Sequence, residues 1–97
     1  MTGKQRAALR ALANELEPIF QIGKTGLTEN FFKQVDEALE AREIIKISVL
    51  RSSEVTPAQA SALLCERLDA QGVNVIGSKF TLYRPSREKP PKIVLEK

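Results

Sequence analysis

The sequence predicts one α/β domain whose helices and strands follow the order α-β-α-β-α-β-β around a four-stranded mixed sheet. Three observations lead to this fold class. A chain of 97 residues has room for a single domain. Helical segments separate the early strands, which makes these strands parallel neighbours. Only two residues join the last two strands, which predicts an antiparallel hairpin. Polar residues at outward strand positions further predict helices on one face of the sheet only; they are Lys46, Ser48, Asn74 and Thr81.

The first helix is expected from Thr2 to about Leu16. Thr2 and Gln5 fit a capping box, in which each side chain accepts a hydrogen bond from the backbone N–H group of the other residue. The helix stops before Pro18, because proline restricts the residue that precedes it. Its apolar stripe consists of Leu9, Leu12 and Leu16. A short strand is expected over 18–22, where proline is tolerated at the first position.

The second helix is expected to follow a capping Thr28. Its apolar stripe consists of Phe31, Val35, Ala38 and Leu39. The opposite face is predicted to be solvated and to point away from any polyanion. That face holds Glu29, Lys33, Asp36, Glu37 and Glu40. Alternation within 44–50 predicts a strand with one buried face, and this face consists of Ile45, Ile47 and Val49.

The third helix has a clear start, with a capping threonine, a proline and then a glutamine at the third helical position (Thr56, Pro57 and Gln59). Gly72 is expected to cap its C-terminus, and its buried stripe consists of Ala60, Leu63, Leu64 and Leu68. Two strands follow over 73–76 and 79–84, joined by a glycine-serine turn. The remainder, 85–97, is expected to be a basic proline-containing tail, in which Ile93-Val94-Leu95 either adds an edge strand or stays loose.

Composition excludes several kinds of chemistry. The chain has no histidine, which removes His-based general bases, triads and metal ligands. Its one cysteine, Cys65, cannot form an internal disulfide, and we expect a buried helix residue there and not a nucleophile. No apolar run approaches the roughly 20 residues of a membrane span, and the N-terminus lacks a signal-peptide core. We therefore expect a cytoplasmic monomer that is not an enzyme and uses no metal, no cofactor and no small-molecule substrate.

Positive charge gathers toward the two ends of the chain, although the net charge is only +3. Residues 1–26 carry +2, and residues 73–97 carry +4 because they hold six basic and two acidic residues. If the fold brings both ends to one side, they form a basic face suited to phosphate groups. The alternative is an ordinary solvated surface with a basic tail.

The segment Gly23-Lys24-Thr25-Gly26 is the one motif that indicates a specific chemistry. A G-x-x-G loop before a helix lets the backbone approach a sugar-phosphate chain, with the loop amides and the helix N-terminus facing the phosphates. The alternative is a tight turn that needs glycines for positive φ angles, and the pattern by itself leaves the two readings about equal. A nucleotide-binding P-loop is excluded, because Pro18 stands where that motif requires glycine. Tyr83 is expected to pack rather than to stack on a base.

Several segments together resemble the CRM-domain family, in its stand-alone bacterial form, the YhbY-like RNA-binding proteins. The resemblance spans Lys4 to Arg84 and is carried by the residues of 22–28 (IGKTGLT), 35–39 (VDEAL), 43–46 (EIIK) and 77–84 (GSKFTLYR). It implies a sheet similar to that of the C-terminal domain of translation initiation factor three. It also implies RNA binding through the glycine loop, and association with precursors of the large ribosomal subunit during their assembly.

The expected organisation is a CRM-type RNA-binding domain over 1–84 and a tail over 85–97. Through the resemblance, the loop residues Gly23, Lys24, Thr25 and Gly26 are expected to contact RNA, with ribosomal RNA as the partner. The charge distribution adds further candidate contacts, namely Lys4, Arg6, Arg10, Arg51, Lys79 and Arg84. The alternative function is a protein-interaction adaptor on the ribosome or on an assembly factor, which would use the exposed sheet face or the tail.

Overall fold

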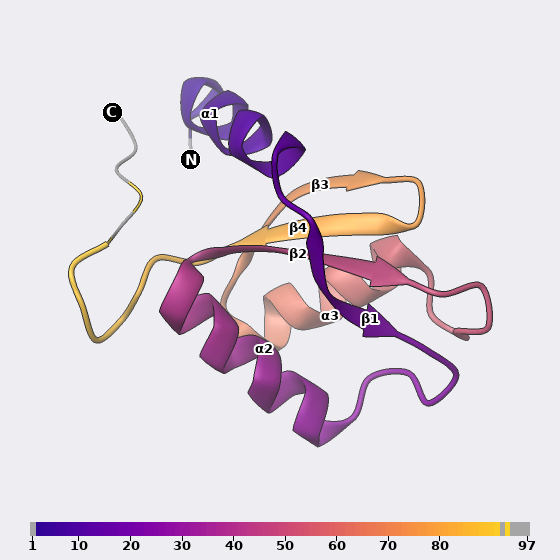
Figure 1. The fold of residues 1–97 in the computed structure, drawn as a ribbon. Coiled ribbons are helices and arrows are strands. Elements are labelled where there is room, and N and C mark those ends of the chain that lie inside the picture. The colour runs from indigo at the N-terminus through magenta and orange to yellow at the C-terminus, as the bar shows by residue number, and fades with distance from the viewer. Residues whose placement is uncertain (1, 92, 94–97) are drawn as a thin grey trace.

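A computed structural model describes residues 2–91 and 93, and its elements follow the expected order (Figure 1). The elements are α1 (Gly3–Asn14), β1 (Pro18–Ile22), α2 (Glu29–Arg42), β2 (Ile44–Val49), α3 (Pro57–Leu68), β3 (Gln71–Ile76) and β4 (Lys79–Tyr83). The four strands form one mixed sheet in the order β1-β2-β4-β3. β1 and β2 are parallel, whereas β4 is antiparallel to both β2 and β3. The predicted mixed sheet and element order are confirmed.

This strand arrangement brings three connections to one end of the sheet. β1 and β2 are parallel, so the segments that follow them, 23–28 and 50–56, leave the sheet on the same side. β4 runs the other way, so the 77–78 turn that precedes it lies there too, and Val49 N–H donates a 2.7 Å hydrogen bond to Ser78 O. We call these three segments the loop edge. Each of α2 and α3 follows directly from one of these segments, α2 from 23–28 and α3 from 50–56.

The helix starts are those that the sequence predicts. Thr2 and Thr56 form complete capping boxes, and the side chain of Thr28 accepts from the backbone N–H of the third helical residue. The predicted C-terminal cap of α3 is wrong, because Asp69 adopts the left-handed conformation there, with a φ of 55°. Gly72 lies instead in β3, where a Cβ atom would come within 3.3 Å of Ser61 Oγ on α3. Glycine at this position allows β3 and α3 to pack closely.

α2 and α3 cover one face of the sheet and enclose the main core (Figure 1). The predicted inward face of β2 is confirmed, since Ile45, Ile47 and Val49 are all buried in this core. The stripe predicted for α3 is wrong at Leu63, whose side chain is 46% exposed. The buried arc of α3 is centred on Ala60 and Leu64, and Leu63 lies one helical step outside that arc.

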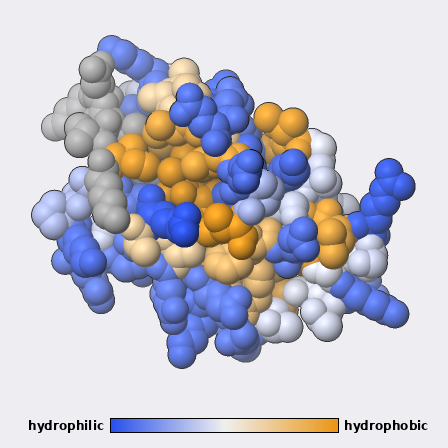
Figure 2. Space-filling model, viewed as in Figure 1, coloured by the Kyte–Doolittle hydropathy of each residue, from blue (hydrophilic) through white to orange (hydrophobic). Residues whose placement is uncertain are grey.

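α1 lies on the opposite face of the sheet (Figure 1). The prediction that helices cover one face only is therefore right for α2 and α3 and wrong for α1. Leu9 of α1 packs on Ile44 and Tyr83, which lie at the end of the sheet remote from the loop edge. Tyr83 is buried in this cluster, which supports a packing role, and the burial, with the nearby Glu43 carboxylate, raises its pKa. Figure 2 shows hydrophobic side chains gathered in the middle of this view, with hydrophilic ones around them.

The tail that follows β4 is bound to the end of α2 through Glu43. This residue caps α2 with a φ of 69°, and its side chain is fully buried. Its carboxylate accepts hydrogen bonds from the backbone N–H groups of Ser86 (3.0 Å) and Ile93 (2.8 Å). Ile93 packs beside the Leu9 cluster and lies outside any strand, while the Val94 and Leu95 of the expected edge strand lie outside the described residues.

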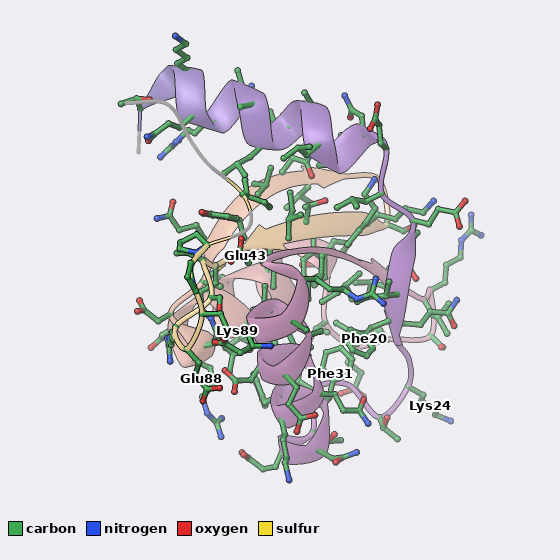
Figure 3. All side chains as sticks on the ribbon, turned by 60° about the vertical axis from the view of Figure 1, so that its left-hand side comes forward. Phe20, Lys24, Phe31, Glu43, Glu88 and Lys89 are labelled. Carbon is green, nitrogen blue, oxygen red and sulfur yellow. The ribbon has the colours of Figure 1, made fainter. Side chains whose placement is uncertain are left out.

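A second carboxylate on α2 holds the same tail, so the acidic face of this helix is only partly solvated, contrary to expectation. Glu40 accepts hydrogen bonds from Ser86 Oγ and from the backbone N–H groups of Arg87 (2.9 Å) and Glu88 (3.2 Å). These bonds, Ser86 first, lower the pKa of Glu40 to about 2. Figure 3 shows Glu88 and Lys89 beside α2 on the side of Glu43.

Candidate nucleic-acid interface

The glycine loop joins the end of β1 to the cap of α2, and aromatic packing fixes both of its flanks. Phe20 of β1 and Phe31 of α2 meet edge to face, with ring centroids 5.7 Å apart (Figure 3). Within the loop, Gly26 N–H donates a 3.0 Å hydrogen bond to Gly23 O, which closes a turn over Lys24 and Thr25. The loop is therefore a defined turn on a rigid base.

The two glycines of the loop differ in what the backbone requires of them. Gly26 has a φ of 69°, a conformation that favours glycine. Gly23 has no positive φ, and a Cβ atom there would meet only Leu50 Cδ1, at an ordinary contact distance of 3.7 Å. Turn geometry explains Gly26 and leaves Gly23 without a structural requirement. A bare backbone at Gly23 is suited to close approach by another chain.

Lys24 and Thr25, at the tip of this turn, are both exposed. Figure 3 shows the Lys24 side chain extending outward from the loop, away from the sheet and the helices. The first turn of α2 is braced from α3, because Arg67 forms a 2.5 Å ion pair with Glu29 and lies over the Phe32 ring. The hydrogen bond and charge of Arg67 lower the pKa of Glu29, and the guanidinium balances the carboxylate charge at the start of α2.

Two of the cations chosen from the charge distribution lie at the loop edge with Lys24. Leu50 N–H donates a 2.9 Å hydrogen bond to Ile22 O, which places Arg51 beside the glycine loop. Lys79 is paired with Ser48 near the end of β2 and is exposed. A groove of about 320 Å³ runs between the 50–56 and 77–78 segments. Its lining includes Leu50, Arg51, Thr56, Gly77 and Ser78.

The cations of α1 lie elsewhere. Lys4, Arg6 and Arg10 are exposed on a helix that packs at the other end of the sheet (Figure 1). β2 alone separates that end from the loop edge by about 16 Å. Arg6 and Arg10 share one flank of α1 with Asn14, four residues further on. The fold therefore keeps the basic N-terminal segment apart from the glycine loop.

Arg84 is a structural residue, and we withdraw it as a predicted RNA contact. Its side chain is 4% exposed and its Nη1 atom donates to Asp36 Oδ1 (2.6 Å) and to Leu68 O (3.0 Å). Its Nη2 atom donates to Asp36 O (3.1 Å). These bonds join β4 to α2 and to the end of α3. Phosphate cannot reach this guanidinium without breaking them.

Lys46, Asn74 and Thr81 are outward strand positions in the sequence and are not among the predicted site residues. In the sheet they form one row across β2, β4 and β3, because Lys46 pairs with Thr81 and Thr81 pairs with Asn74. The only signal in the sequence is their alternation with apolar residues. The register that aligns them depends on pairing between distant segments.

Cys65 is half-buried on α3, and burial raises the pKa of its thiol. A raised pKa reduces the thiolate fraction, so this environment suits packing better than nucleophilic chemistry. In the part of the chain that the structure describes, no three His, Cys, Asp or Glu side chains gather as metal ligands would. Across residues 2–91 and 93, no helix has the length and apolar character to cross a membrane.

The fold and the loop edge define a small α/β domain in which a lysine-tipped glycine loop joins the first strand to the second helix. The chain belongs to the CRS1/YhbY (CRM) domain family, whose model matches residues 1–84. This membership confirms the resemblance seen in the sequence.

Similar proteins come from several bacteria. The Bacillus subtilis protein named "Probable RNA-binding protein YqeI" is 46% identical over 88 residues, which cover 91% of this chain and 92% of the relative. A Haemophilus influenzae protein named "RNA-binding protein" is 33% identical over 88 residues, covering 91% and 89%. A Staphylococcus aureus protein, whose solution structure is described as that of a candidate RNA-binding protein, matches with a TM-score of 0.70 and 43% identity, covering 99% of each chain.

Proposed function

We propose that this chain is a non-catalytic RNA-binding protein that acts as a cytoplasmic monomer in assembly of the large ribosomal subunit. Its core is the domain over 1–84, and it holds the RNA backbone at the loop edge. The observation that carries the proposal is the glycine at position 23, which neither φ nor packing requires. Close approach of a sugar-phosphate chain accounts for it.

The electrostatics of the loop edge favour an anionic chain. Lys24 and Arg51 are exposed there, and the N-termini of α2 and α3 add the positive ends of two helix dipoles. Contacts of this kind position a nucleic acid and carry no base information by themselves. The relatives described above are named for RNA binding, which supports RNA as the partner. The ribosomal part of the proposal rests on the family resemblance alone.

The adaptor alternative finds less support in the sheet edges. Strand addition needs a regular edge with free backbone groups. The outer strands β1 and β3 both contain register shifts, at Pro18–Phe20 and at Gly72–Asn74. An adaptor would instead have to use side-chain contacts on the open sheet face.

The salt dependence of RNA binding tests the backbone contact. In a double variant, Lys24→Ala with Lys79→Ala, the slope of log K against log salt should fall by about 1.4, because each contact with single-stranded RNA contributes roughly 0.7. A control is Lys89→Ala, which removes one positive charge from the tail beside α2 and should leave the slope as in wild type. A double variant whose slope equals that of the wild type would exclude this surface.

Sucrose-gradient sedimentation of cell extract tests the ribosomal role. Co-migration with large-subunit precursors at low salt, with release at moderate salt, is the expected result. A protein that stays at the top of the gradient under both conditions would contradict stable ribosomal association. Salt-insensitive capture of a protein, together with no RNA binding, would favour the adaptor function.

A further inference from the structure

The open face of the sheet contains a polar hollow beside the C-terminal end of α1. Its volume is about 210 Å³, which is smaller than the roughly 300 Å³ at which drug-sized ligand pockets begin. The hollow is lined by Asn14, Lys46, Asn74, Ile76, Lys79 and Thr81. Strand pairing sets five of these residues in two adjacent rows, Lys46–Thr81–Asn74 and Lys79–Ile76. The lining is therefore held by the rigid part of the fold.

Thr81 carries a polar atom that the fold leaves without a partner. The residue is fully buried, and its Oγ1 atom has no hydrogen-bond partner among the described residues. Buried hydroxyl groups are nearly always hydrogen-bonded, since an unpaired one is destabilising. Valine has the same shape and a high strand propensity, so packing alone does not require the hydroxyl here. A ligand in the hollow would supply the missing hydrogen bond.

The other lining groups indicate the chemistry of that ligand. Lys46 and Lys79 offer two ammonium groups for an anion, and no acidic side chain lines the hollow. Asn14 and Asn74 each offer an amide that both donates and accepts, as recognition of a base edge requires. Thr81 is fully buried although it lines the hollow, so a ligand would reach its hydroxyl only with a movement of neighbouring side chains; Lys46 and Lys79, in the same lining, have flexible stems.

We propose that this hollow binds one unpaired nucleotide of the RNA, with its phosphate at Lys46 and Lys79 and its base edge at Asn74, Thr81 and Asn14. This inference rests on the proposed RNA binding and adds base selectivity to it. Lys79 belongs both to the hollow and to the neighbourhood of the loop edge, because it pairs with Ser48 and follows the 77–78 turn. One strand can therefore pass from the glycine loop into the hollow.

The test compares binding of four single-stranded homopolymer oligoribonucleotides and one RNA duplex. In Thr81→Val and in Asn74→Ala, affinity for the preferred homopolymer should fall by about tenfold, the effect of losing one good base contact. Affinity for the duplex and the salt slope should stay as in wild type. Thr81→Val should also raise Tm, because it removes the unpaired hydroxyl. A gain in stability together with a selective loss of affinity is not expected of a merely structural residue.

Controls separate failure of the hollow from failure of RNA binding itself. Ser48→Ala changes a buried residue on the same face that does not line the hollow, and it should bind all five RNAs as wild type does. If Thr81→Val and Asn74→Ala both bind every RNA as wild type does, while Lys24→Ala binds more weakly, the hollow is not a nucleotide site. An equal loss for all homopolymers and the duplex would also overturn the proposal. If wild type and Lys24→Ala alike bind none of these RNAs, the proposed function itself is wrong.

Discussion

Gly23 and Gly26 occupy the two ends of one turn, and alanine should have opposite effects at the two positions. At Gly26, with its φ of 69°, alanine should lower the free energy of unfolding by about 1–2 kcal/mol. At Gly23, alanine should raise that free energy by about 0.4–1 kcal/mol, because it restricts the unfolded chain without straining the folded one. Urea unfolding of the two variants measures both changes.

In Gly23→Ala, the affinity for RNA should change in the opposite direction to the free energy of unfolding. Gly23→Ala places a methyl group on the surface that we expect a phosphate to approach, so this variant should be more stable and yet bind RNA more weakly. Gly3→Ala, at the start of α1, is a control because a Cβ atom there meets nothing within 4 Å and the position lies outside the glycine loop. If Gly23→Ala binds RNA with wild-type affinity, the segment is a tight turn and its backbone does not contact RNA at position 23.

Arg84 shows why a charge distribution alone selects the wrong arginine. Replacing it with alanine should lower the free energy of unfolding by about 2 kcal/mol, since hydrogen bonds to charged groups are lost from a buried position. The salt slope of RNA binding should not change. Arg51→Ala, at an exposed position, should show the reverse, with stability within about 0.5 kcal/mol of wild type and a smaller slope. A reduced slope in Arg84→Ala, with unchanged stability, would show that Arg84 contacts RNA after all.

At the scale of the elements, the tail is bound to α2 in a pH-dependent way. The folded-state pKa of Glu40, about 2, lies below its ordinary value of 4.5. Unfolded chains therefore bind more protons between these values, and the stabilisation is complete above pH 4.5 and is lost as the pH falls toward 2. NMR titration of the Arg87 and Glu88 amides should give a midpoint near 2, because both donate to this carboxylate.

The unfolding free energy should report the same titration. From pH 4.5 down to pH 2, wild type should lose more stability than Glu40→Gln does. Glu37→Gln, which removes an exposed charge from the same helix, should follow wild type. Parallel curves for wild type and Glu40→Gln would show that this carboxylate does not stabilise the tail.

Helix starts were predictable and helix surroundings were not, for a physical reason. Capping of α1 and α3 depends on residues three apart, so Thr2 and Thr56 could be identified from the sequence. A local rule predicts Gly72 as a helix cap, whereas close contact between β3 and α3 accounts for the glycine that the structure places in the strand. Likewise, packing of α1 on the second face depends on Leu9 meeting Ile44 and Tyr83, far along the chain.

The candidate site follows the same rule: its contiguous part could be predicted from the sequence, and the contacts between distant residues could not. The glycine loop is contiguous in sequence and could be recognised directly. The placement of Arg51 and Lys79 at the same end of the sheet follows from parallel pairing of β1 with β2 and from the turn that precedes β4. Burial of Arg84 against Asp36 links residues 48 apart, and the polar hollow joins α1 to three strands. No local pattern encodes either arrangement.

At the scale of the whole molecule, the exposed cations of α1 and those of the loop edge lie apart on a body whose long dimension is 39 Å. The effect of the α1 cations should therefore depend on RNA length. With an oligonucleotide of about four residues, the number that a GxxG loop clamps in a KH domain, a double variant of Arg6→Ala and Arg10→Ala should bind as wild type does. With a strand several times longer it should bind more weakly. Equal losses for both lengths would place α1 beside the loop, contrary to the fold.

The register shifts in β1 and β3 also affect how copies of this protein behave toward one another. A flat outer strand is a template on which a second copy can add its own strand, and repeated addition leads to aggregates. Here the first outer strand has five residues and starts with proline, and the second is bent between Gly72 and Asn74. Val75 and Ile76, which are exposed, follow this shift and pair with Phe80 and Lys79 of β4. Crowding many copies onto one long RNA should thus leave each of them folded, separate and able to dissociate.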